Sequence, residues 1–174
     1  MLVELEPLLR RYTYRRETLC RDLAQLTVEQ LDWRPVQACT TIGTLLLHIA
    51  GIEDLKIASI KGLNIHKRWQ QSHWEKLRPG FAIELKIPGP QGHTIGYYLE
   101  ILRTLQKNTY RYIRTIDQAT LGRSSPFYIE GKDFQPGCFE ELQNHALLIS
   151  ILQHEQYHRG QIMLLKFIYK QLHT

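Results

Sequence analysis

Apolar positions recur at helical spacing in four segments of the chain, and long polar connections rich in Gly and Pro separate them. The predicted helices cover residues 7–26, 40 or 41 to about 61, 94–116 and 139–172. The second reads IGTLLLHIAGIEDLKIASI and is apolar almost all round, which a helix tolerates only when neighbours cover most of its surface. Four long helices without a convincing alternating strand predict an all-α fold, an antiparallel four-helix bundle.

The connections at 62–93 and 118–138 are predicted to be long and irregular. The first contains Pro88, Gly89 and Pro90, and we expect some local helix and a role in walling or covering a pocket. The second is rich in Gly and Pro, with a short extended piece at 127–129. We expect one domain over residues 1–174, because a chain of this length makes two ordinary domains improbable.

The composition points to a protein of a reducing cytoplasm. No run of 18 apolar residues is present, and the first residues carry charge where a signal peptide needs an apolar core, so neither a membrane span nor export is expected. The three cysteines, Cys20, Cys39 and Cys138, are widely spaced and form no CxxC motif. That pattern argues against a disulfide framework and against a thiolate metal cluster.

The net charge of +5 raises the question of an anionic partner. Lys and Arg are scattered, with small clusters at residues 10–11, 15–16 and 67–68, and no nucleic-acid-binding motif accompanies them. Nucleic-acid binding is therefore disfavoured, since scattered basic residues usually form a solvated face. Attraction of anionic small molecules is equally compatible with the charge.

Two histidines four residues apart, His154 and His158, carry the chemical signal of the sequence. One helical turn separates them, so both imidazoles can face one metal ion. His48 lies within the apolar second helix and points toward other helices, which makes it the candidate third ligand. Three histidines leave a fourth metal position for a water or a thiol, whose pKa the ion lowers. The alternative for each histidine is a hydrogen-bonded core residue.

The remaining histidines are weaker candidates. His145 falls on about the opposite side of the last helix from His154. His66, His73, His93 and His173 lie in connections or at the terminus, where we expect them to be solvated.

His154, Glu155 and His158 also match HExxH, the helix signature of zinc metallopeptidases. Those enzymes usually take their third ligand from downstream, yet no Asp or Glu follows Glu155 in this chain. Gln161 and Leu164 occupy the Gly and His positions of the extended motif. Peptidase activity is therefore disfavoured.

Three neighbours of the histidines are candidate second-sphere or substrate-contacting residues: Glu155, Arg159 and Gln161. Glu155 and Arg159 have the spacing of an i, i+4 ion pair, which is the structural alternative to a functional role. Gln161 follows His158 by one turn and is placed to orient an imidazole through its second nitrogen. Gly160 costs helix stability, so we expect another helix to pack closely there.

Two blocks resemble the DinB-like (DinB/YfiT) superfamily. One is LDWRP at 31–35 with TIGTLLLHIA at 41–50, and the other is HEQYHRGQI at 154–162. The resemblance implies a four-helix bundle holding a divalent metal, often nickel or zinc, through His48, His154 and His158. The resemblance also implies frequent homodimers. Some members of the superfamily are transferases or isomerases that use low-molecular-weight thiols.

We therefore expect a metal-dependent enzyme, either a low-molecular-weight-thiol S-transferase or a hydrolase acting on a small-molecule substrate. The alternative is a non-catalytic bundle whose metal is structural or regulatory and which binds a small ligand or a partner. Zinc or nickel is the expected ion, although three neutral imidazoles suit copper and iron as well.

Overall fold

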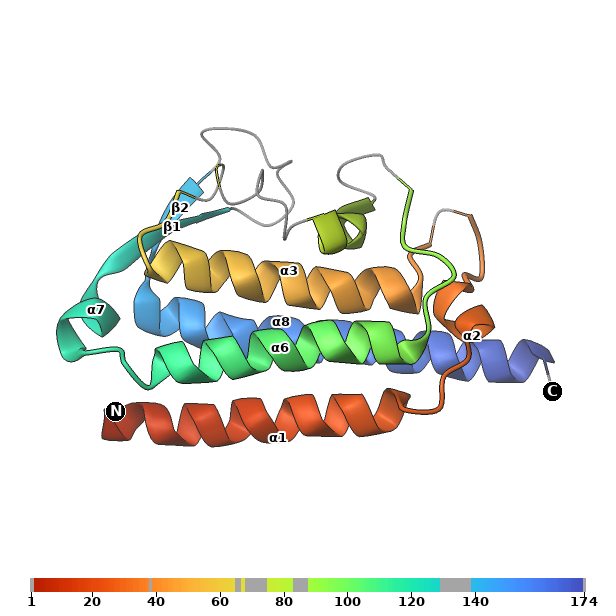
Figure 1. Ribbon diagram of the computed structural model, residues 1–174, viewed down its shortest axis with the longest axis horizontal. Coiled ribbons are helices and arrows are strands. Elements are labelled where there is room, and N and C mark those ends of the chain that lie inside the picture. Colours follow the sequence, from red (N-terminus) through yellow and green to blue (C-terminus); the bar gives the residue numbers. More distant parts are fainter. Residues whose placement is uncertain are drawn as a thin grey trace.

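Four long helices form the body of the molecule (Figure 1). The computed structural model describes residues 2–37, 39–64, 67, 75–82, 88–128 and 139–173. The long helices are α1 (Glu6–Leu23), α3 (Ile42–Ile60), α6 (Ile95–Ile113) and α8 (Asn144–His173). They confirm the predicted all-α four-helix bundle, and their order along the chain is the predicted one.

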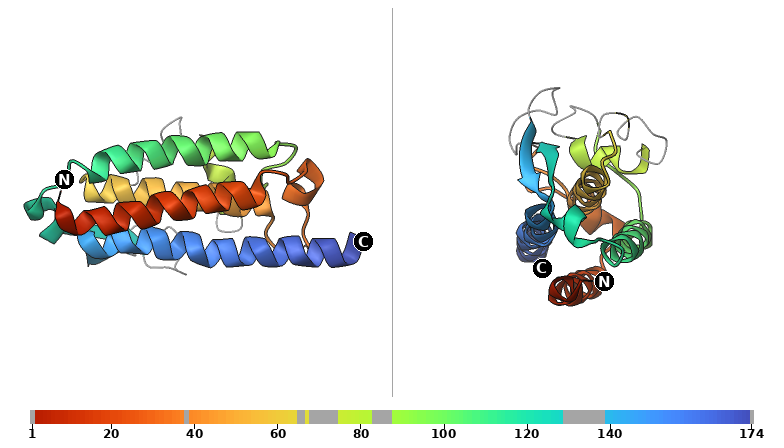
Figure 2. Two further views of the ribbon diagram at one scale, coloured as in Figure 1. Left: turned by 90° about the horizontal axis from the view of Figure 1, so that it is seen from below. Right: turned by 90° about the vertical axis from the view of Figure 1, so that its left-hand side faces the viewer.

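The helices run in two directions. In Figure 1, α1 and α8 run from left to right and α3 and α6 run back. The end-on view of Figure 2 shows α3 between α6 and α8, with α1 closing the ring on the far side. Because α3 packs against both α6 and α8, most of its surface is covered, and of its nineteen residues all but His48 are buried. This explains why its sequence is apolar almost all round.

Side-chain caps fix where the helices begin. The Thr41 side chain accepts a hydrogen bond from the backbone N–H of Thr44 and caps α3. Thr27 and Gln30 form a capping box at the start of α2 (Val28–Asp32). These bonds satisfy N–H groups that have no partner within the helix.

The connection between α6 and α8 departs from the prediction. It contains α7 (Gln118–Gly122) and a two-stranded antiparallel sheet of β1 (Ser124–Tyr128) and β2 (Phe139–Gln143). The expected extended piece at 127–129 therefore lies partly in β1. The last helix begins at Asn144, so the prediction that it begins at 139 is wrong. Pairing with β1 makes this segment a strand. The local sequence does not signal this pairing, because the interaction is non-local.

The connection between α3 and α6 contains the 3-10 helix η3 (Arg78–Phe81). This turn packs against α3. The N-terminal 3-10 turn η1 (Val3–Leu5) leads directly into α1. None of the described helices combines the length and the apolar character needed to cross a membrane.

Candidate metal centre

Helices α3 and α8 bring three histidines together inside the bundle. His48 projects from α3, and His154 and His158 project from successive turns of α8. One ring nitrogen of each lies within 4.8 Å of the others. The ring centroids are 5.0 Å apart for His48 and His154, 4.8 Å for His48 and His158, and 4.4 Å for His154 and His158. The three predicted ligands thus form one cluster.

Burial keeps two of these imidazoles neutral. It lowers the pKa of His48 to about 4, and repulsion from His158 adds to the effect. It lowers the pKa of His154 to about 2, again with contributions from the other two histidines. A neutral imidazole offers the lone pair that a metal ion requires, so His48 and His154 are in the ligating state at neutral pH.

The two nitrogens of His158 have different partners. Nδ1 lies 2.7 Å from Oε1 of Gln161, an oxygen that can only accept, so Nδ1 carries the proton. Nε2 then presents its lone pair, and it lies 3.0 Å from Nε2 of His154. Two imidazole nitrogens meeting in this way need either a shared proton or a cation between them. The donor set therefore fits a divalent metal ion, and Gln161 occupies the predicted orienting position.

The 3-10 turn η3 forms one wall beside His48. The Phe81 ring is fully buried, with its centroid 4.8 Å from that of His48. Gly80 lies so close to the backbone of Leu47 and His48 that a Cβ atom there would collide with Cβ of Leu47 at 2.8 Å. A hydrogen bond between His48 and the Gly80 backbone partly offsets the lowering of the His48 pKa. The described part of the connection after α3 thus packs beside His48.

A buried charge network involves the same two helices as the cluster. Arg16 of α1 is fully buried and binds two carboxylates, Glu53 of α3 at 2.6 Å and Glu155 of α8 at 2.7 Å. Tyr12 and Thr109 donate hydrogen bonds to Glu53. Burial alone would lower the pKa of Arg16, but the two carboxylates raise it well above its usual value. The network ties together the two helices that carry the histidines.

The chain matches the family model of the DinB superfamily over residues 11–162. That stretch includes all three histidines of the cluster and most of the bundle. The chain belongs to the DinB superfamily. No curated protein sequence matches it.

Solved structures share the DinB fold at low sequence identity. A conserved protein from Enterococcus faecalis has a TM-score of 0.62 at 18% identity, with 95% of each chain covered. The DinB-like protein YjoA from Bacillus subtilis has a TM-score of 0.60 at 13% identity, covering 97% of this chain and 94% of its own. YfiT from Bacillus subtilis, described as a probable metal-dependent hydrolase with an unusual four-helix bundle topology, has a TM-score of 0.61 at 15% identity. This alignment covers 98% of the present chain and 90% of YfiT.

Two sequence interpretations of this DinB-superfamily chain are wrong in detail. Glu155 and Arg159 do not pair with each other, because Glu155 is turned inward to Arg16 while Arg159 binds Asp22 at 2.6 Å. The expected close packing at Gly160 is also missing, since a Cβ atom there would meet nothing within 4 Å among the described residues. Glu155 is thus held by Arg16 and is not placed as the general base of an HExxH peptidase.

Sequence reasoning missed the partners of Glu155. Arg16 falls on the buried stripe of α1 with Tyr12 and Leu19, and Glu53 interrupts the apolar run of α3. A charged residue at a core position of each helix was the available signal, because such charges are buried only in pairs.

The other histidines lie apart from the cluster. His145 and His173 are exposed, and His93 is half-buried and stacks on Tyr97. His66 and His73 lie outside the described residues.

Proposed function

We propose that this chain is a metal-dependent hydrolase in which His48, His154 and His158 hold a divalent ion, zinc or nickel. The observation that carries the proposal is the convergence of their three ring nitrogens within 4.8 Å. The description of YfiT as a probable metal-dependent hydrolase supports the same class of reaction. A divalent ion held by three imidazoles supplies an acidified water or thiol at its remaining position.

The protein groups around the site have separate tasks in this proposal. Gln161 holds the proton of His158 on Nδ1 and directs Nε2 to the ion. Phe81 excludes water from one side of His48. Glu155, bound by Arg16, fixes the register of α8 against α3 and so the separation of the ligands. Arg159 is held by Asp22, with both side chains part-exposed, and has no substrate role in this proposal.

Metal binding is tested on the purified protein. We expect about one divalent ion per chain by elemental analysis, and its loss in His158→Ala. The control is His145→Ala, which removes an exposed histidine from the same helix and keeps the metal. Equal metal content in the two variants would contradict the proposal of a three-histidine metal site.

The reaction class is tested on the metal-loaded protein. Hydrolysis of activated esters or amides that is lost in His158→Ala and retained in His145→Ala supports the hydrolase. Turnover that requires an added thiol such as bacillithiol, mycothiol or glutathione would identify S-transfer instead. Tight metal binding with neither activity, and no exchangeable water on the ion, would identify a structural or regulatory metal.

We also propose that the chain forms a homodimer through α8. Tyr157, Leu164 and Phe167 are 64%, 57% and 61% exposed, and with Gly160 they follow one stripe of the helix. A second copy packing there would use the open space at Gly160. We expect a dimer by light scattering, converted to a monomer by Phe167→Glu. Leu63→Glu, which changes an exposed apolar side chain elsewhere, should leave the dimer intact.

A further inference from the structure

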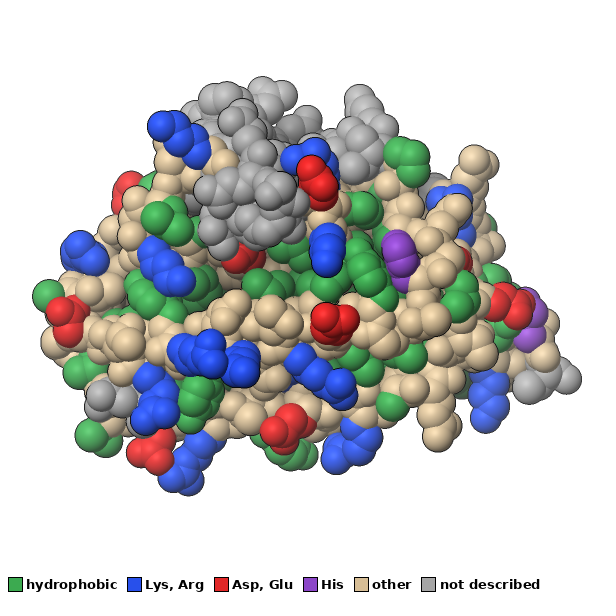
Figure 3. All heavy atoms as spheres, viewed as in Figure 1, with side chains coloured by type: hydrophobic (Ala, Val, Ile, Leu, Met, Phe, Trp, Pro, Cys, Tyr) green, Lys and Arg blue, Asp and Glu red, His purple; other side chains and the backbone are tan. Residues whose placement is uncertain are grey.

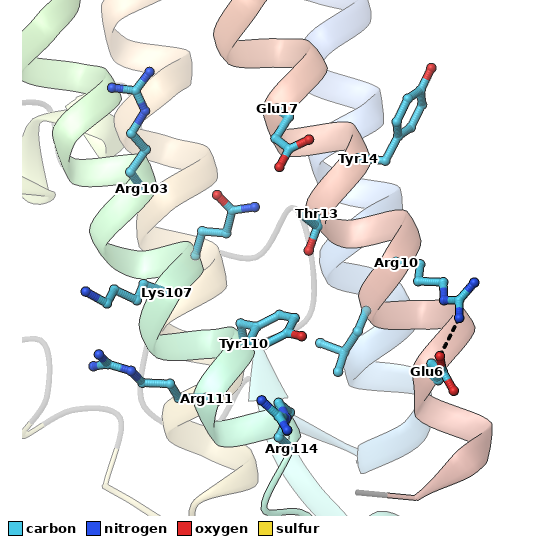
Figure 4. A pocket seen from close by; sticks show the side chains of 12 residues that line it. Glu6, Arg10, Thr13, Tyr14, Glu17, Arg103, Lys107, Tyr110, Arg111 and Arg114 are labelled. Carbon is cyan, nitrogen blue, oxygen red and sulfur yellow. Dashed lines mark hydrogen bonds and ion pairs between the residues drawn. The ribbon is translucent and has the colours of Figure 1, made fainter.

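A groove of about 880 Å³ runs between α1 and α6, away from the histidines (Figure 4). None of the three candidate ligands lines it. In Figure 4, Tyr110 points from α6 toward α1, and Thr13 and Glu17 of α1 lie farther along the groove, toward Arg103. The groove is therefore a second candidate site, independent of the metal centre and of the function proposed above.

The lining of this groove is strongly basic. Five cationic side chains and two carboxylates line it, and the cations are Arg10, Arg103, Lys107, Arg111 and Arg114. Four of them belong to α6 and its C-cap, and Figure 3 shows Lys and Arg gathered over this helix. The sequence hides the cluster, because positions 103, 107, 111 and 114 are scattered along the chain and gather only once helical periodicity is applied.

The cations of α6 have no carboxylate partner among the residues that the structure describes. Arg10 pairs with Glu6 at 2.5 Å, whereas within the described part of the chain Arg103, Lys107 and Arg111 form no ion pair. Arg114 lies over the Tyr110 ring, 5.8 Å from its centroid. All four α6 side chains are exposed.

Helix stability does not explain this arrangement. Arg111 and Arg114 lie at the C-terminal end of α6, where cations interact favourably with the helix dipole. Arg103 and Lys107 lie farther up the helix, beyond the reach of that effect. Lys107 is four residues from both Arg103 and Arg111, and like charges at this spacing destabilise a helix. A bound anion would remove the repulsion.

We propose that the groove binds a small molecule carrying two or more phosphate groups, of the size of a nucleoside polyphosphate. Its volume falls in the range of small-molecule sites, roughly 300–1,000 Å³. The phosphates lie against Lys107 and Arg111, and the Tyr110 ring, 37% exposed, offers an apolar contact to the rest of the ligand.

The α1 side of the groove selects against a continuous polyanion. Glu6 and Glu17 repel a chain of phosphates that follows the groove, but they accept hydrogen bonds from hydroxyl or amino groups. Thr13, also on α1, adds a hydroxyl group. A ligand with phosphates at one end and hydrogen-bond donors at the other therefore satisfies both sides.

The test is fluorescence titration of the full chain with N-methylanthraniloyl-ATP in EDTA, which removes any contribution of the metal centre. We expect saturable binding that weakens at least tenfold in Lys107→Glu/Arg111→Glu. The control, Arg11→Glu/Arg21→Glu, gives the same net charge of +1 (5 − 4) and changes exposed arginines that do not line the groove. Circular dichroism confirms that both variants are folded. Equal weakening in both, or none in the first, would overturn the proposal.

Competition experiments show whether the groove recognises the phosphate groups or the nucleoside of the ligand. Inorganic triphosphate should displace the probe and adenosine should not, because the cations recognise phosphate. Displacement by adenosine as effective as by ATP would overturn phosphate recognition. If a dT10 oligonucleotide binds much more tightly than ATP and its affinity falls steeply with salt, the ligand is a nucleic-acid strand and not a small molecule.

Discussion

Arg16 donates two hydrogen bonds to a single oxygen of Glu155, from Nε at 3.0 Å and from a terminal nitrogen at 2.7 Å. The same guanidinium binds Glu53 on α3 and the backbone carbonyl of Leu102 on α6. One side chain of α1 therefore connects all four helices. Because it binds Glu155, the residue that follows His154 in the chain, it is a positioning residue for the candidate metal centre.

Replacing Arg16 should be strongly destabilising. Arg16→Met leaves Glu53 and Glu155 buried without their counter-charge, and breaking a buried pair in this way costs about 3–5 kcal/mol in free energy of unfolding. Urea denaturation checks this value. Arg21→Met, at an exposed position of the same helix, should change stability by at most about 0.5 kcal/mol.

The charge balance of the network is tested in the Arg16→Met background. Glu53→Gln and Glu155→Gln remove the uncompensated charges, so together they should recover part of the lost stability. If Arg16→Met and Arg21→Met are equally stable, the network contributes nothing to the fold.

The metal-free protein should lose stability as the pH falls from about 6.5 toward 4. Unfolded histidine has a pKa near 6.5, whereas burial lowers that of His48 to about 4 and that of His154 to about 2. Between these values the unfolded chain binds protons that the folded chain does not, so acid favours unfolding. Urea denaturation in EDTA at several pH values measures the slope.

A matched variant isolates these two histidines from the carboxylates that titrate in the same range. His48→Gln/His154→Gln removes both groups, so its stability should fall less steeply between pH 6.5 and 4. An identical slope in the variant and the wild type would contradict the assignment.

The helices and the histidine cluster could be predicted from sequence because both depend on local periodicity. The spacing of His154 and His158 and the apolar surroundings of His48 identify one face of each helix. The strand at Phe139–Gln143 could not be predicted in this way, since its partner is β1 and FEELQ contains no helix breaker. Long-range pairing decides its conformation.

Contacts between segments that are distant in the sequence could not be predicted either. Phe81 meets His48 through a 3-10 turn whose sequence has no helical period. Glu155 looked like the partner of Arg159 because i, i+4 spacing is a local rule. Its true partner, Arg16, lies 139 positions away in the chain.

Replacing glycine by alanine at the same position of two helices of equal length should have different effects on stability. Gly43 and Gly96 are each the second residue of a nineteen-residue helix. A Cβ atom at Gly43 would lie 2.9 Å from Cζ of the fully buried Tyr98, whereas at Gly96 the nearest atom is 3.6 Å away. Gly43→Ala should destabilise by about 1–3 kcal/mol through overpacking. Gly96→Ala should be neutral or stabilising. Thermal unfolding compares them, and equal melting temperatures would contradict the packing.

Gln161 should control metal affinity without being a ligand. Its Oε1 accepts a hydrogen bond from Nδ1 of His158 at 2.7 Å, which favours the tautomer whose Nε2 lone pair is directed at the cluster. Gln161→Ala removes that acceptor and leaves all three imidazoles in place, so affinity for zinc should fall about 10–100-fold. Gln161→Glu keeps an acceptor oxygen at the same reach and should retain most of the affinity. Competition with a chromogenic chelator measures both variants. Because Gln161 is half-buried on α8, their unfolding curves without metal should overlap with that of the wild type. Unchanged affinity in Gln161→Ala would show that packing alone fixes the His158 ring.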